Sequence, residues 1–330
     1  MPLRALQTEP QLMVQTSATE RTAPVMFVSI VMCTRNRSDQ IGQAVQSVLD
    51  NDYPNFELVI VDQSTDDETR AVVTQMTPHH PNLRYIYTEK AGLSRAYNIG
   101  IHESTGDVLG FTDDDCVAAK DWVRSIASVF GDEPSVDMVY GQVLLPAALQ
   151  GHTGEVPTLA IHRAELIDRS SGFRVYGMGA NFAMRRRLYE TIGGFDEALG
   201  GGGPLKSSQD FDFQYRAYLA GATVALRPDV NVDHYGLRTV EQWPATQRAY
   251  GFGDGAFYCK HIRCGDAFAL RMFASRIVRM TARETLIKLG VRRRPSQWLY
   301  LRSCFTGMRA SLRFGVDRQQ RMYRPATANA

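Results

Sequence analysis

Hydrophobic residues in the first third of the chain form four short runs that alternate with amphipathic segments. The runs are Phe27–Cys33, Phe56–Asp62, Leu83–Tyr87 and Asp107–Thr112, each rich in Val, Ile or aromatic residues and short enough for a strand. Apolar positions from Ile41 to Leu49 repeat every 3.6 residues and predict a helix capped by Ser38; further helices are expected at about 66–76 and 93–103. This alternation predicts βαβ units, and therefore a parallel sheet covered by helices on both faces.

The pattern changes after residue 115. We expect a helix near 120–130, strands at 138–144 and 179–184, and a helix at about 210–220 that Gly221 ends. A glycine run, 200–203, precedes that helix, and the chain is mainly helical from residue 240. The pattern thus predicts a loose polar leader (1–24), an α/β domain (25–238) with halves 25–116 and 117–238, and a helical extension (239–330).

The bulk composition excludes several classes of protein. With 44% hydrophobic and 22% charged residues, the 330-residue chain can bury a large core. It shows neither the apolar core of a signal peptide nor about 18 apolar residues in a row, so we expect a cytoplasmic location. The five cysteines are scattered and form no CxxC pair, which argues against a disulfide framework and against a structural zinc site.

Charge is segregated along the chain although its net value is only +2. Residues 261–330 hold 15 basic and 3 acidic side chains, whereas residues 1–260 hold 22 basic and 32 acidic ones. The basic tail therefore suits an anionic surface as a partner. Nucleic acid is not expected as that partner because no nucleic-acid-binding motif accompanies the charge.

Three consecutive carboxylates, Asp113, Asp114 and Asp115, follow the fourth hydrophobic run. Adjacent buried carboxylates repel one another, so their clustering at the end of a strand favours a divalent cation, Mn²⁺ or Mg²⁺, that neutralises them. Open α/β sheets bind ligands at this edge, where a cation can also bridge two phosphates. The alternative is an acidic turn that caps the next helix.

Two earlier strands also end in polar residues that would point into the same crevice. Thr34, Arg35 and Arg37 follow the first strand, and Asp62 ends the second. The arginines could hold phosphate, and the carboxylate of Asp62 could accept the N3–H of a uracil or thymine ring. Asp62 could equally be a helix N-cap.

In combination and in order, several segments resemble family 2 glycosyltransferases over roughly Val28 to Gly236. The segments are Val28–Arg37, Glu57–Asp62, Gly92–Gly100, Asp113–Asp115, Gly179–Arg186 and Gly193–Glu197. The resemblance implies the GT-A fold, which is an α/β fold with a Rossmann-like nucleotide-binding sheet, here followed by a mainly helical C-terminal extension. It also implies a metal-dependent, inverting transfer of a sugar from a nucleotide-diphosphate donor to an acceptor hydroxyl. Residues 25–116 would be the nucleotide-sugar-binding half and residues 117–238 the acceptor-binding half.

The resemblance also implies roles for individual residues. Asp62 matches a base-binding aspartate, Arg95 an arginine that faces the phosphates, and Asp113 and Asp115 the two ends of a DxD motif. Asp115 is the expected direct metal ligand. His234 falls where such enzymes place a histidine on the metal or the diphosphate, although a structural histidine is the alternative. The nucleotide-sugar site would then comprise Thr34, Arg35, Arg37, Asp62, Arg95, Asp113 and Asp114, and Gly179 and Asn181 would contact the acceptor.

The general base is expected at the start of the helix near residue 210. Inversion requires a carboxylate that takes a proton from the acceptor hydroxyl. The family usually has a Glu-Asp pair here, whereas this chain has Gln209 and Asp210. Asp210 is therefore predicted as the base, with Gln209 at the acceptor; a first-turn residue favoured by the helix dipole is the alternative, and Asp212 is the fallback base. The preceding glycine run is predicted to be a mobile loop on the acceptor side.

The tail and the acceptor leave alternatives open. Cationic and apolar residues alternate from Phe268 to Arg294, and a second helix carrying Trp298 follows Pro295. These helices could lie on an anionic lipid headgroup layer, which suits a lipid-linked acceptor as well as a saccharide one, or their apolar faces could pack on the domain. We expect a UDP-sugar donor and a role in polysaccharide or glycolipid assembly, peripheral on the inner face of the membrane. A nucleotidyltransferase and an inactive membrane-associated scaffold are the rival functions.

Overall fold

The computed structural model describes residues 26–289 and 297–324. The predicted leader, 1–24, and the arginines at 292–294 lie outside these residues. The first four predicted strands are present as β1 (Val28–Thr34), β2 (Phe56–Asp62), β3 (Leu83–Tyr87) and β4 (Val108–Asp113). They pair in parallel, as the alternating pattern predicts, and their order in the sheet is β3-β2-β1-β4.

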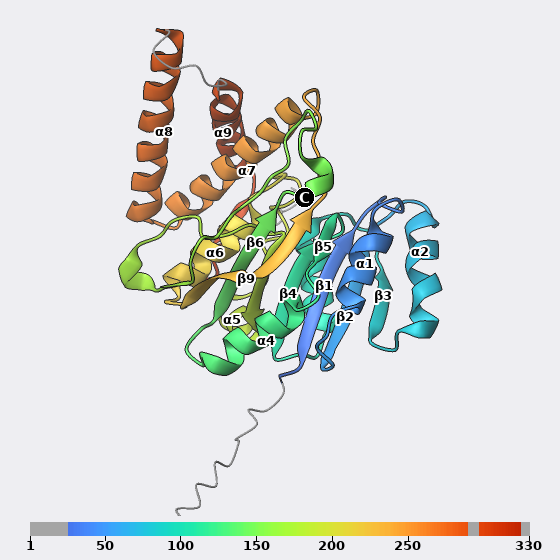
Figure 1. Cartoon of the computed structure of the whole chain (residues 1–330). Coiled ribbons are helices and arrows are strands. Elements are labelled where there is room, and N and C mark those ends of the chain that lie inside the picture. The colour runs from blue at the N-terminus through green and yellow to red at the C-terminus, as the bar shows by residue number, and fades with distance from the viewer. Residues whose placement is uncertain (1–25, 290–296, 325–330) are drawn as a thin grey trace, which may run out of the picture.

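Helices cover both faces of this sheet (Figure 1). They are α1 (Ile41–Leu49), α2 (Glu68–Met76), α3 (Leu93–Glu103), α4 (Trp122–Asp132), α5 (Arg186–Ile192) and α6 (Gln209–Leu219). Alternate residues of each central strand face opposite sides, so Ile30 packs in a core with α1, α2 and α4. Val31 packs in a second core with α3, α5 and α6. The predicted two-sided burial is confirmed.

The second half of the sheet is mixed rather than parallel, which the sequence pattern left open. The remaining strands are β5 (Cys116–Ala118), β6 (Met138–Leu144), β7 (Glu165–Ile167), β8 (Asn181–Arg185) and β9 (Val224–His234). The sheet continues from β4 as β8-β6-β9-β5, and β8 runs antiparallel to both β4 and β6. This reversal extends the sheet beyond the parallel half that the hydrophobic runs predict.

Strand β9 is the longest strand and was missed because Pro228 interrupts its hydrophobic pattern. Proline cannot donate to a β ladder and usually excludes a central strand. Here the pairing with β6 shifts its register between Gly141 and Gln142, so the ladder passes from Arg227 directly to Asn231. The irregularity accommodates Pro228 and lets β9 continue to His234, which it delivers to the edge of the sheet.

Of two helix ends predicted from the sequence, Gly221 is confirmed and Ser38 is not. Gly221 has φ = 84° after α6, and the N–H groups of Gly221 and Ala222 donate to the carbonyls of Tyr218 and Ala217, which is a Schellman motif. Ser38 does not cap α1, because the helix begins later, with Gln40 as its N-cap. The Ser38 hydroxyl instead donates to Glu68.

Three long helices follow β9, as expected: α7 (Trp243–Arg263), α8 (Ala267–Lys288) and α9 (Trp298–Ser311). A short hairpin, β10 (Gly315–Asp317) and β11 (Met322–Arg324), ends the described chain. In Figure 1, α7 lies across the end of the domain above α6, while α8 projects outward beside α9. No helix in the described ranges is both long and apolar enough to cross a membrane.

Candidate active site

The polar residues predicted at the ends of strands do meet at one edge of the sheet. Thr34 pairs with Asp62 at the end of β1 and β2, and Cys33 pairs with Asp113 at the end of β1 and β4. The carboxyl ends of parallel strands are the usual ligand-binding edge of such sheets. The edge therefore exists as the sequence predicts.

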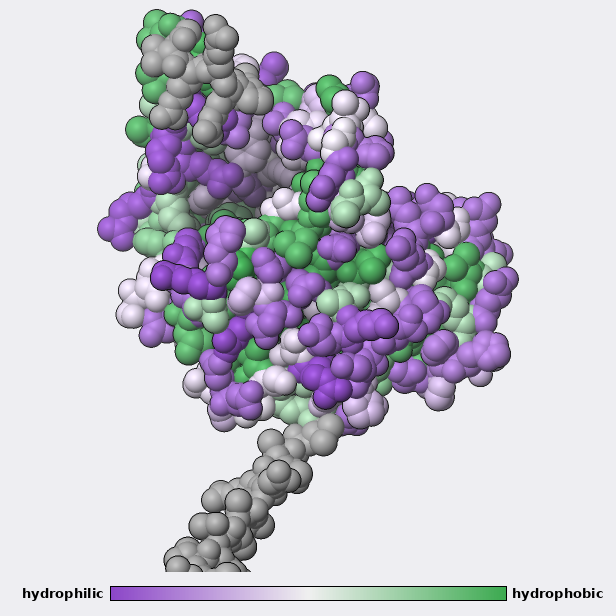
Figure 2. Space-filling view, in the orientation of Figure 1, coloured by the Kyte–Doolittle hydropathy of each residue, from purple (hydrophilic) through white to green (hydrophobic). Residues whose placement is uncertain are grey.

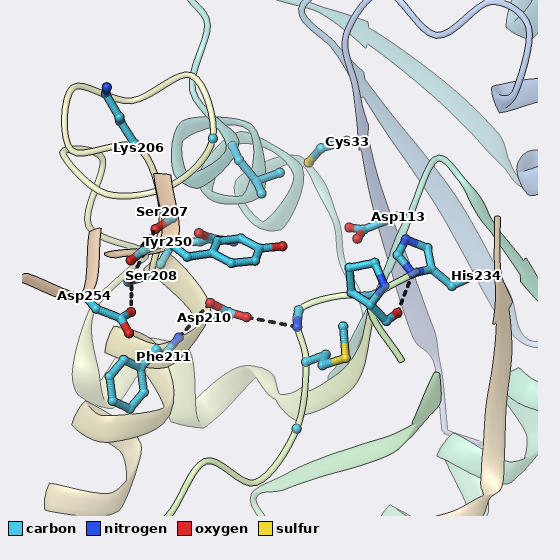
Figure 3. A pocket seen from close by; sticks show the side chains of 18 of the residues that line it. Cys33, Asp113, Lys206, Ser207, Ser208, Asp210, Phe211, His234, Tyr250 and Asp254 are labelled. Carbon is cyan, nitrogen blue, oxygen red and sulfur yellow. Dashed lines mark hydrogen bonds between the residues drawn. The ribbon is translucent and has the colours of Figure 1, made fainter. Parts of the chain in front are cut away.

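A cavity of about 670 Å³ opens at this edge. Its size lies within the range of small-molecule sites. Several predicted site residues line it: Arg37, Asp113, Asp114, Asp115, Gly179, Gln209, Asp210 and His234. Figure 3 shows Asp113 and His234 on one side of the cavity and Asp210 on the opposite side. The two predicted chemical functions, cation binding and proton acceptance, thus face one space.

Four potential metal ligands cluster on the sheet side of the cavity. Asp113, Asp115, Cys116 and His234 each offer a ligand atom, and these atoms all lie within 4.8 Å of one another. Asp115 and His234 were predicted as ligands, Asp113 only as part of the DxD motif, and Cys116 was missed. Strand β9 carries His234 to this place by pairing antiparallel with β5, where His234 lies opposite Cys116.

The orientation of His234 suits metal binding. Its Nδ1 lies 2.8 Å from the carbonyl oxygen of Pro157, so this nitrogen carries a proton and donates it. Its Nε2 lies 3.3 Å from Oδ1 of Asp115. Metal-bound histidines typically donate their second ring nitrogen to a carbonyl in this way. Burial lowers the pKa of His234, but the hydrogen bond and charge of Asp115 outweigh it and raise that pKa.

Gly236 leaves space next to these ligand atoms. A Cβ at this position would lie 2.4 Å from Nε2 of His234 and 2.8 Å from Oδ2 of Asp115, too close for any side chain. The absence of a side chain keeps both ligand atoms accessible from the cavity. The residues present therefore fit a hard divalent cation with carboxylate and imidazole ligands.

The three carboxylates are electrostatically strained. Burial, and then the charge of Asp115, raise the pKa of Asp113 to about 7. Burial and Asp115 likewise raise the pKa of Asp114 to about 6, although its Oδ2 accepts a hydrogen bond from Thr34 at 2.7 Å. Burial opposes ionisation of Asp115, but His234, Arg37 and Arg238 lower its pKa. None of the three caps α4, whose N-cap is Asp121, so the helix-cap alternative is wrong.

Asp210 is held by backbone amides across the cavity. Its Oδ2 accepts from the N–H of Gly179 at 3.1 Å and its Oδ1 from the N–H of Phe211 at 2.9 Å. Burial raises the pKa of Asp210 and the nearby Asp254 adds to the rise, while these two amides oppose it. A carboxylate with a raised pKa is a stronger base near neutral pH.

Two further predicted residues near Asp210 lie elsewhere than expected. Asn181 is fully buried; its Oδ1 accepts from Trp122, and its Nδ2 donates to the carbonyls of Gln142 and Val230. It ties strands together and does not face the cavity, which corrects the acceptor-binding prediction. Asp212 is also fully buried, in contact with Arg216, Lys260 and His261, so it cannot serve as the fallback base.

The predicted donor-binding residues are only partly gathered. Asp62 ends β2, and its two oxygens accept from the Ser64 N–H and the Tyr85 hydroxyl. It is not a helix N-cap, because α2 begins after Asp67. Arg95 pairs with Glu197 at 2.5 Å, and Arg35 is exposed. Like Thr34, these three residues are not among those that line the cavity.

Sequence reasoning missed the cavity wall that the C-terminal helices supply. Tyr250 and Asp254 of α7, Arg276 of α8 and Tyr300 of α9 all line the cavity, as do Lys206 and Arg238. In Figure 3 the ring of Tyr250 extends between Asp210 and Asp113. The four-residue spacing of Tyr250 and Asp254 could have placed both on one helix face, but nothing local indicates that this face meets the cavity.

One cavity-lining residue has an unfilled hydrogen bond. Tyr97 of α3 is 1% exposed, and its hydroxyl has no hydrogen-bond partner within the described residues. Burial, followed by the charge of Asp113, raises its pKa. Buried polar groups are normally hydrogen-bonded, so a hydroxyl without a partner at a cavity wall is consistent with a ligand that supplies one.

Comparison with known proteins agrees with this geometry. The family model described as Glycosyl transferase family 2 matches residues 29–193, half of the chain. Glycosyltransferase AglE of Haloferax volcanii is 27% identical over 213 residues, 63% of this chain and 67% of that protein. Beta-monoglucosyldiacylglycerol synthase of Synechocystis is 24% identical over 227 residues, 66% of this chain and 46% of that protein. The chain spans between about half and two thirds of the length of the curated relatives it matches first.

Solved structures show the same fold. A mannosyltransferase from Pyrobaculum calidifontis, in complex with GDP-Man and Mn²⁺, superposes with a TM-score of 0.59 at 18% identity and covers 87% of both chains. TarS of S. aureus in complex with UDP-GlcNAc superposes with a TM-score of 0.53 and covers 69% of this chain and 66% of that one. At these identities the likeness concerns the fold alone, and it confirms the predicted GT-A fold with a helical C-terminal part.

Proposed function

The chain belongs to glycosyl transferase family 2, and from this premise we propose that it is a metal-dependent, inverting hexosyltransferase. The donor would be a nucleotide-diphosphate sugar and the acceptor nucleophile a hydroxyl. The observation that carries the proposal is the placement of Asp210 across one cavity from the cluster of Asp113, Asp115 and His234. A nucleotidyltransferase, the rival function, has no support from the family match.

Asp115 and His234, with Asp113, would hold Mn²⁺ or Mg²⁺. The bound cation would supply charge stabilisation for the departing diphosphate. The ring orientation of His234, fixed by Pro157, and the absence of a side chain at Gly236 beside the ligand atoms support this assignment. The mannosyltransferase of similar fold was solved with Mn²⁺, which supports the choice of a hard cation.

Asp210 would act as the general base. The acceptor oxygen attacks the anomeric carbon from the side opposite the diphosphate, and the bond from that carbon to the diphosphate breaks with its electron pair. The hydroxyl proton passes to Asp210. The amides of Gly179 and Phe211 orient the carboxylate for this transfer, and Gln209 would contact the acceptor beside it. This in-line geometry inverts the configuration of the sugar.

We favour UDP as the nucleotide. The proposal rests on Asp62, whose ionised carboxylate has lone pairs beyond the two used by Ser64 and Tyr85 and could accept a uracil N3–H. Arg37 lines the cavity and would face the phosphates. Arg35 and Arg95 would reach the donor only if their side chains move, since neither lines the cavity. TarS was solved with UDP-GlcNAc, whereas the mannosyltransferase was solved with GDP-Man.

A donor screen combined with one substitution tests the function. Turnover of UDP-, GDP- and dTDP-sugars should require Mn²⁺ or Mg²⁺ and should be highest with a UDP-sugar. Asp210→Asn should lower kcat by about 10²–10⁴-fold, the usual contribution of a general base. Asp229→Asn, an exposed carboxylate on β9, is the control. No turnover with any donor, or an Asp210→Asn variant as active as the control, would favour an inactive scaffold.

We further propose that α8 and α9 bind an anionic membrane surface, which suits a lipid-linked acceptor. Only Ala269, Met280 and Glu284 are buried among the 22 residues of α8. Among its apolar residues Leu270 is 51% exposed and Val278 67% exposed. The first turns of α8 do pack on the domain, because Phe268, Met272 and Phe273 lie against the buried cluster around Tyr215 and Phe257. The proposal concerns the apolar residues of α8 that stay exposed. Figure 2 shows hydrophobic residues at the outer end of α8, with hydrophilic ones below them.

One face of α9 carries exposed aromatic and basic residues, as a membrane-binding surface requires. Trp298, Arg302, Phe305, Arg309 and Leu312 recur every three or four residues and are exposed. Aromatic residues interleaved with arginines combine apolar burial with attraction to anionic headgroups. Among the relatives, one is named a glucosyl-dolichyl phosphate glucuronosyltransferase and another a beta-monoglucosyldiacylglycerol synthase, which supports glycolipid assembly as a role.

Vesicle sedimentation tests this surface. The protein should bind vesicles of phosphatidylcholine with 30% phosphatidylserine and not pure phosphatidylcholine vesicles, and high salt should weaken binding. Arg302→Glu combined with Arg309→Glu should abolish it. Equal binding of the variant and the unchanged protein would contradict the proposal.

A further inference from the structure

The turn before Asp210 adopts an unusual backbone conformation. Lys206 has φ = 73° and Ser208 has φ = 71°, both in the left-handed region that residues with a side chain rarely adopt. Ser208 is also the N-cap of α6, two residues before the proposed base, yet its side chain caps no helical N–H. Such residues persist only where their surroundings hold them, so the contacts of this turn decide where Asp210 lies.

Helix α7 supplies those contacts to all three residues of the turn. The ammonium of Lys206 lies 4.9 Å from the ring centroid of Phe252. The hydroxyl of Ser207 donates to the carbonyl of Ala249 at 2.9 Å, and the hydroxyl of Ser208 donates to Oδ1 of Asp254 at 2.6 Å. The turn that leads into Asp210 is thus fixed from the C-terminal extension, not from the α/β domain alone.

The glycine-rich segment 251–255 explains how α7 comes so close. A Cβ on Gly253 would lie 2.1 Å from Oγ of Ser207. On the other side of the helix, a Cβ on Gly251 would lie 2.3 Å from the carbonyl oxygen of Tyr300, and one on Gly255 1.9 Å from that of Cys304. The segment does not fit a nucleotide-binding fingerprint; its glycines let α7 contact both the turn and α9 directly.

Asp254 is in turn held by the other two C-terminal helices. Its Oδ2 lies 3.0 Å from NH2 of Arg276 on α8 and accepts a hydrogen bond from the hydroxyl of Tyr300 on α9. Only 15% of the Asp254 side chain is exposed. One carboxylate oxygen therefore faces the turn, and the other is fixed by an arginine and a tyrosine that also line the cavity.

We propose that Asp254 is a positioning residue that, through Ser208, sets the carboxylate of Asp210 against the acceptor hydroxyl. The C-terminal helices are then part of the catalytic unit. This inference rests on the proposed function, because it assigns Asp254 to the base of that reaction. Figure 3 shows the hydrogen bond between Ser208 and Asp254, with Asp210 beside this pair.

Four variants test this assignment with the full chain and its best donor. Asp254→Asn removes the negative charge of the acceptor, and Ser208→Ala removes the donor. Each should lower kcat about 10- to 100-fold, as expected for a hydrogen bond to a charged group, while the KM for the donor stays within about twofold. The double variant should lower kcat no more than the stronger single one, because both changes act on one contact. Arg248→Ala, an exposed residue of the same helix, is the control and should match the unchanged protein.

Thermal unfolding separates positioning from a general loss of structure. All variants should keep a cooperative transition, and lowering the assay temperature should not restore the kcat of Asp254→Asn. Tyr300→Phe, which removes the second contact of Asp254, should give a smaller loss of kcat in the same direction. Either multiplicative losses in the double variant or recovery of kcat on cooling would overturn the proposal.

The failure of this inference is distinct from failure of the proposed function. If the unchanged protein transfers sugar and Asp210→Asn is inactive, but Asp254→Asn and Ser208→Ala match Arg248→Ala, only the positioning role is wrong. If the unchanged protein turns over no donor, or Asp210→Asn remains fully active, the proposed function itself is wrong.

Discussion

Two buried groups of carboxylates in this protein differ in how their charge is neutralised. The first, the acidic corner, consists of Asp113, Asp114, Asp115 and His234 at the cavity. The second, the clamp, consists of Asp196, Asp212, Arg216, Lys260 and His261 between α6 and α7. In the clamp, Nζ of Lys260 lies 2.6 Å from Asp196 and 2.7 Å from Asp212, and Arg216 lies 2.9 Å from Asp212.

Among the described residues, no lysine or arginine lies as close to the acidic corner, where the nearest basic group is the imidazole of His234, 3.3 Å from Asp115. The guanidinium of Arg37 lies 3.5 Å from Asp115, and that of Arg238 lies 3.9 Å from it. The pKa values follow this difference. Burial opposes ionisation of Asp212, yet Lys260 and Arg216 hold its pKa well below the usual range, whereas burial and Asp115 raise the pKa of Asp113 to about 7.

The comparison shows that burial of acids alone does not mark a ligand site. Buried charges are tolerated when they are paired, and the clamp is paired by side chains of this chain. The acidic corner has less positive charge close to its carboxylates and opens to a cavity, which is the arrangement expected of the cation site that we propose. Charge compensation thus distinguishes a structural cluster from a candidate binding site.

The largest effect should come from the acidic corner. Asp115→Asn removes the expected direct metal ligand and should lower kcat/KM on the order of 10³-fold, because a bound cation contributes several kcal/mol of charge stabilisation. Its melting temperature should no longer rise with Mn²⁺, whereas that of the unchanged protein should. Steady-state kinetics and thermal shift measure the two. An unaltered Mn²⁺ response in the variant would remove Asp115 from the metal site.

A substitution in the clamp should have the opposite result: it should lower the stability of the protein and leave Mn²⁺ binding unchanged. Lys260→Met leaves Asp196 and Asp212 buried without their shared cation and should lower the free energy of unfolding by about 3–5 kcal/mol. The Mn²⁺-dependent shift in melting temperature should persist, because the acidic corner is untouched. Urea unfolding measures the first effect. A variant as stable as the unchanged protein would show that the clamp contributes nothing net.

How far the sequence predicts the fold depends on whether neighbouring residues determine an element. The parallel half follows from local hydrophobic runs, and strand β2 and helix α3 begin and end at the predicted residues. Strand β9 was missed because Pro228 breaks its pattern, and only the irregular pairing with β6 accommodates it. Long-range pairing therefore decides what local propensity cannot.

The same limit applies to the site. The acidic corner is largely contiguous in sequence, so its carboxylates could be found from a motif. Asp254, Arg276 and Tyr300 are separated by more than 20 residues each and meet only through the packing of three helices. Asn181 is the opposite case, because a motif residue predicted to bind the acceptor is buried and hydrogen-bonds neighbouring strands. The signal for these roles is tertiary contact, which no spacing encodes.

The clamp also predicts a dependence of stability on pH. Burial, with smaller contributions from the charges of Lys260 and Arg321, lowers the pKa of His261 to about 4 despite the opposing effect of Asp212. Below pH 6.5 the unfolded chain binds a proton at this histidine that the folded chain excludes until about pH 4. Acidification across this window should therefore cost about 3 kcal/mol of stability through this residue.

His261→Gln removes that titration and isolates its contribution. The variant should lose less stability than the unchanged protein between pH 6.5 and pH 4, even if it is less stable at pH 7. Urea unfolding at several pH values gives both slopes. Identical slopes would mean that His261 protonates within the folded protein near its ordinary pKa.

The smallest effect is expected for a substitution beside the acidic corner, at Gly236. Gly236→Ala would place a methyl carbon 2.4 Å from Nε2 of His234 and 2.8 Å from Oδ2 of Asp115. Because these atoms face the space where a cation would bind, Mn²⁺ affinity should fall about 10- to 100-fold, as when the surroundings of metal ligands are altered. Gly131→Ala, with open space around its Cβ, is the matched control. Titration of Mn²⁺ by thermal shift compares the two, and equal affinities would place the cation away from Gly236, on the side of Asp113 and Cys116.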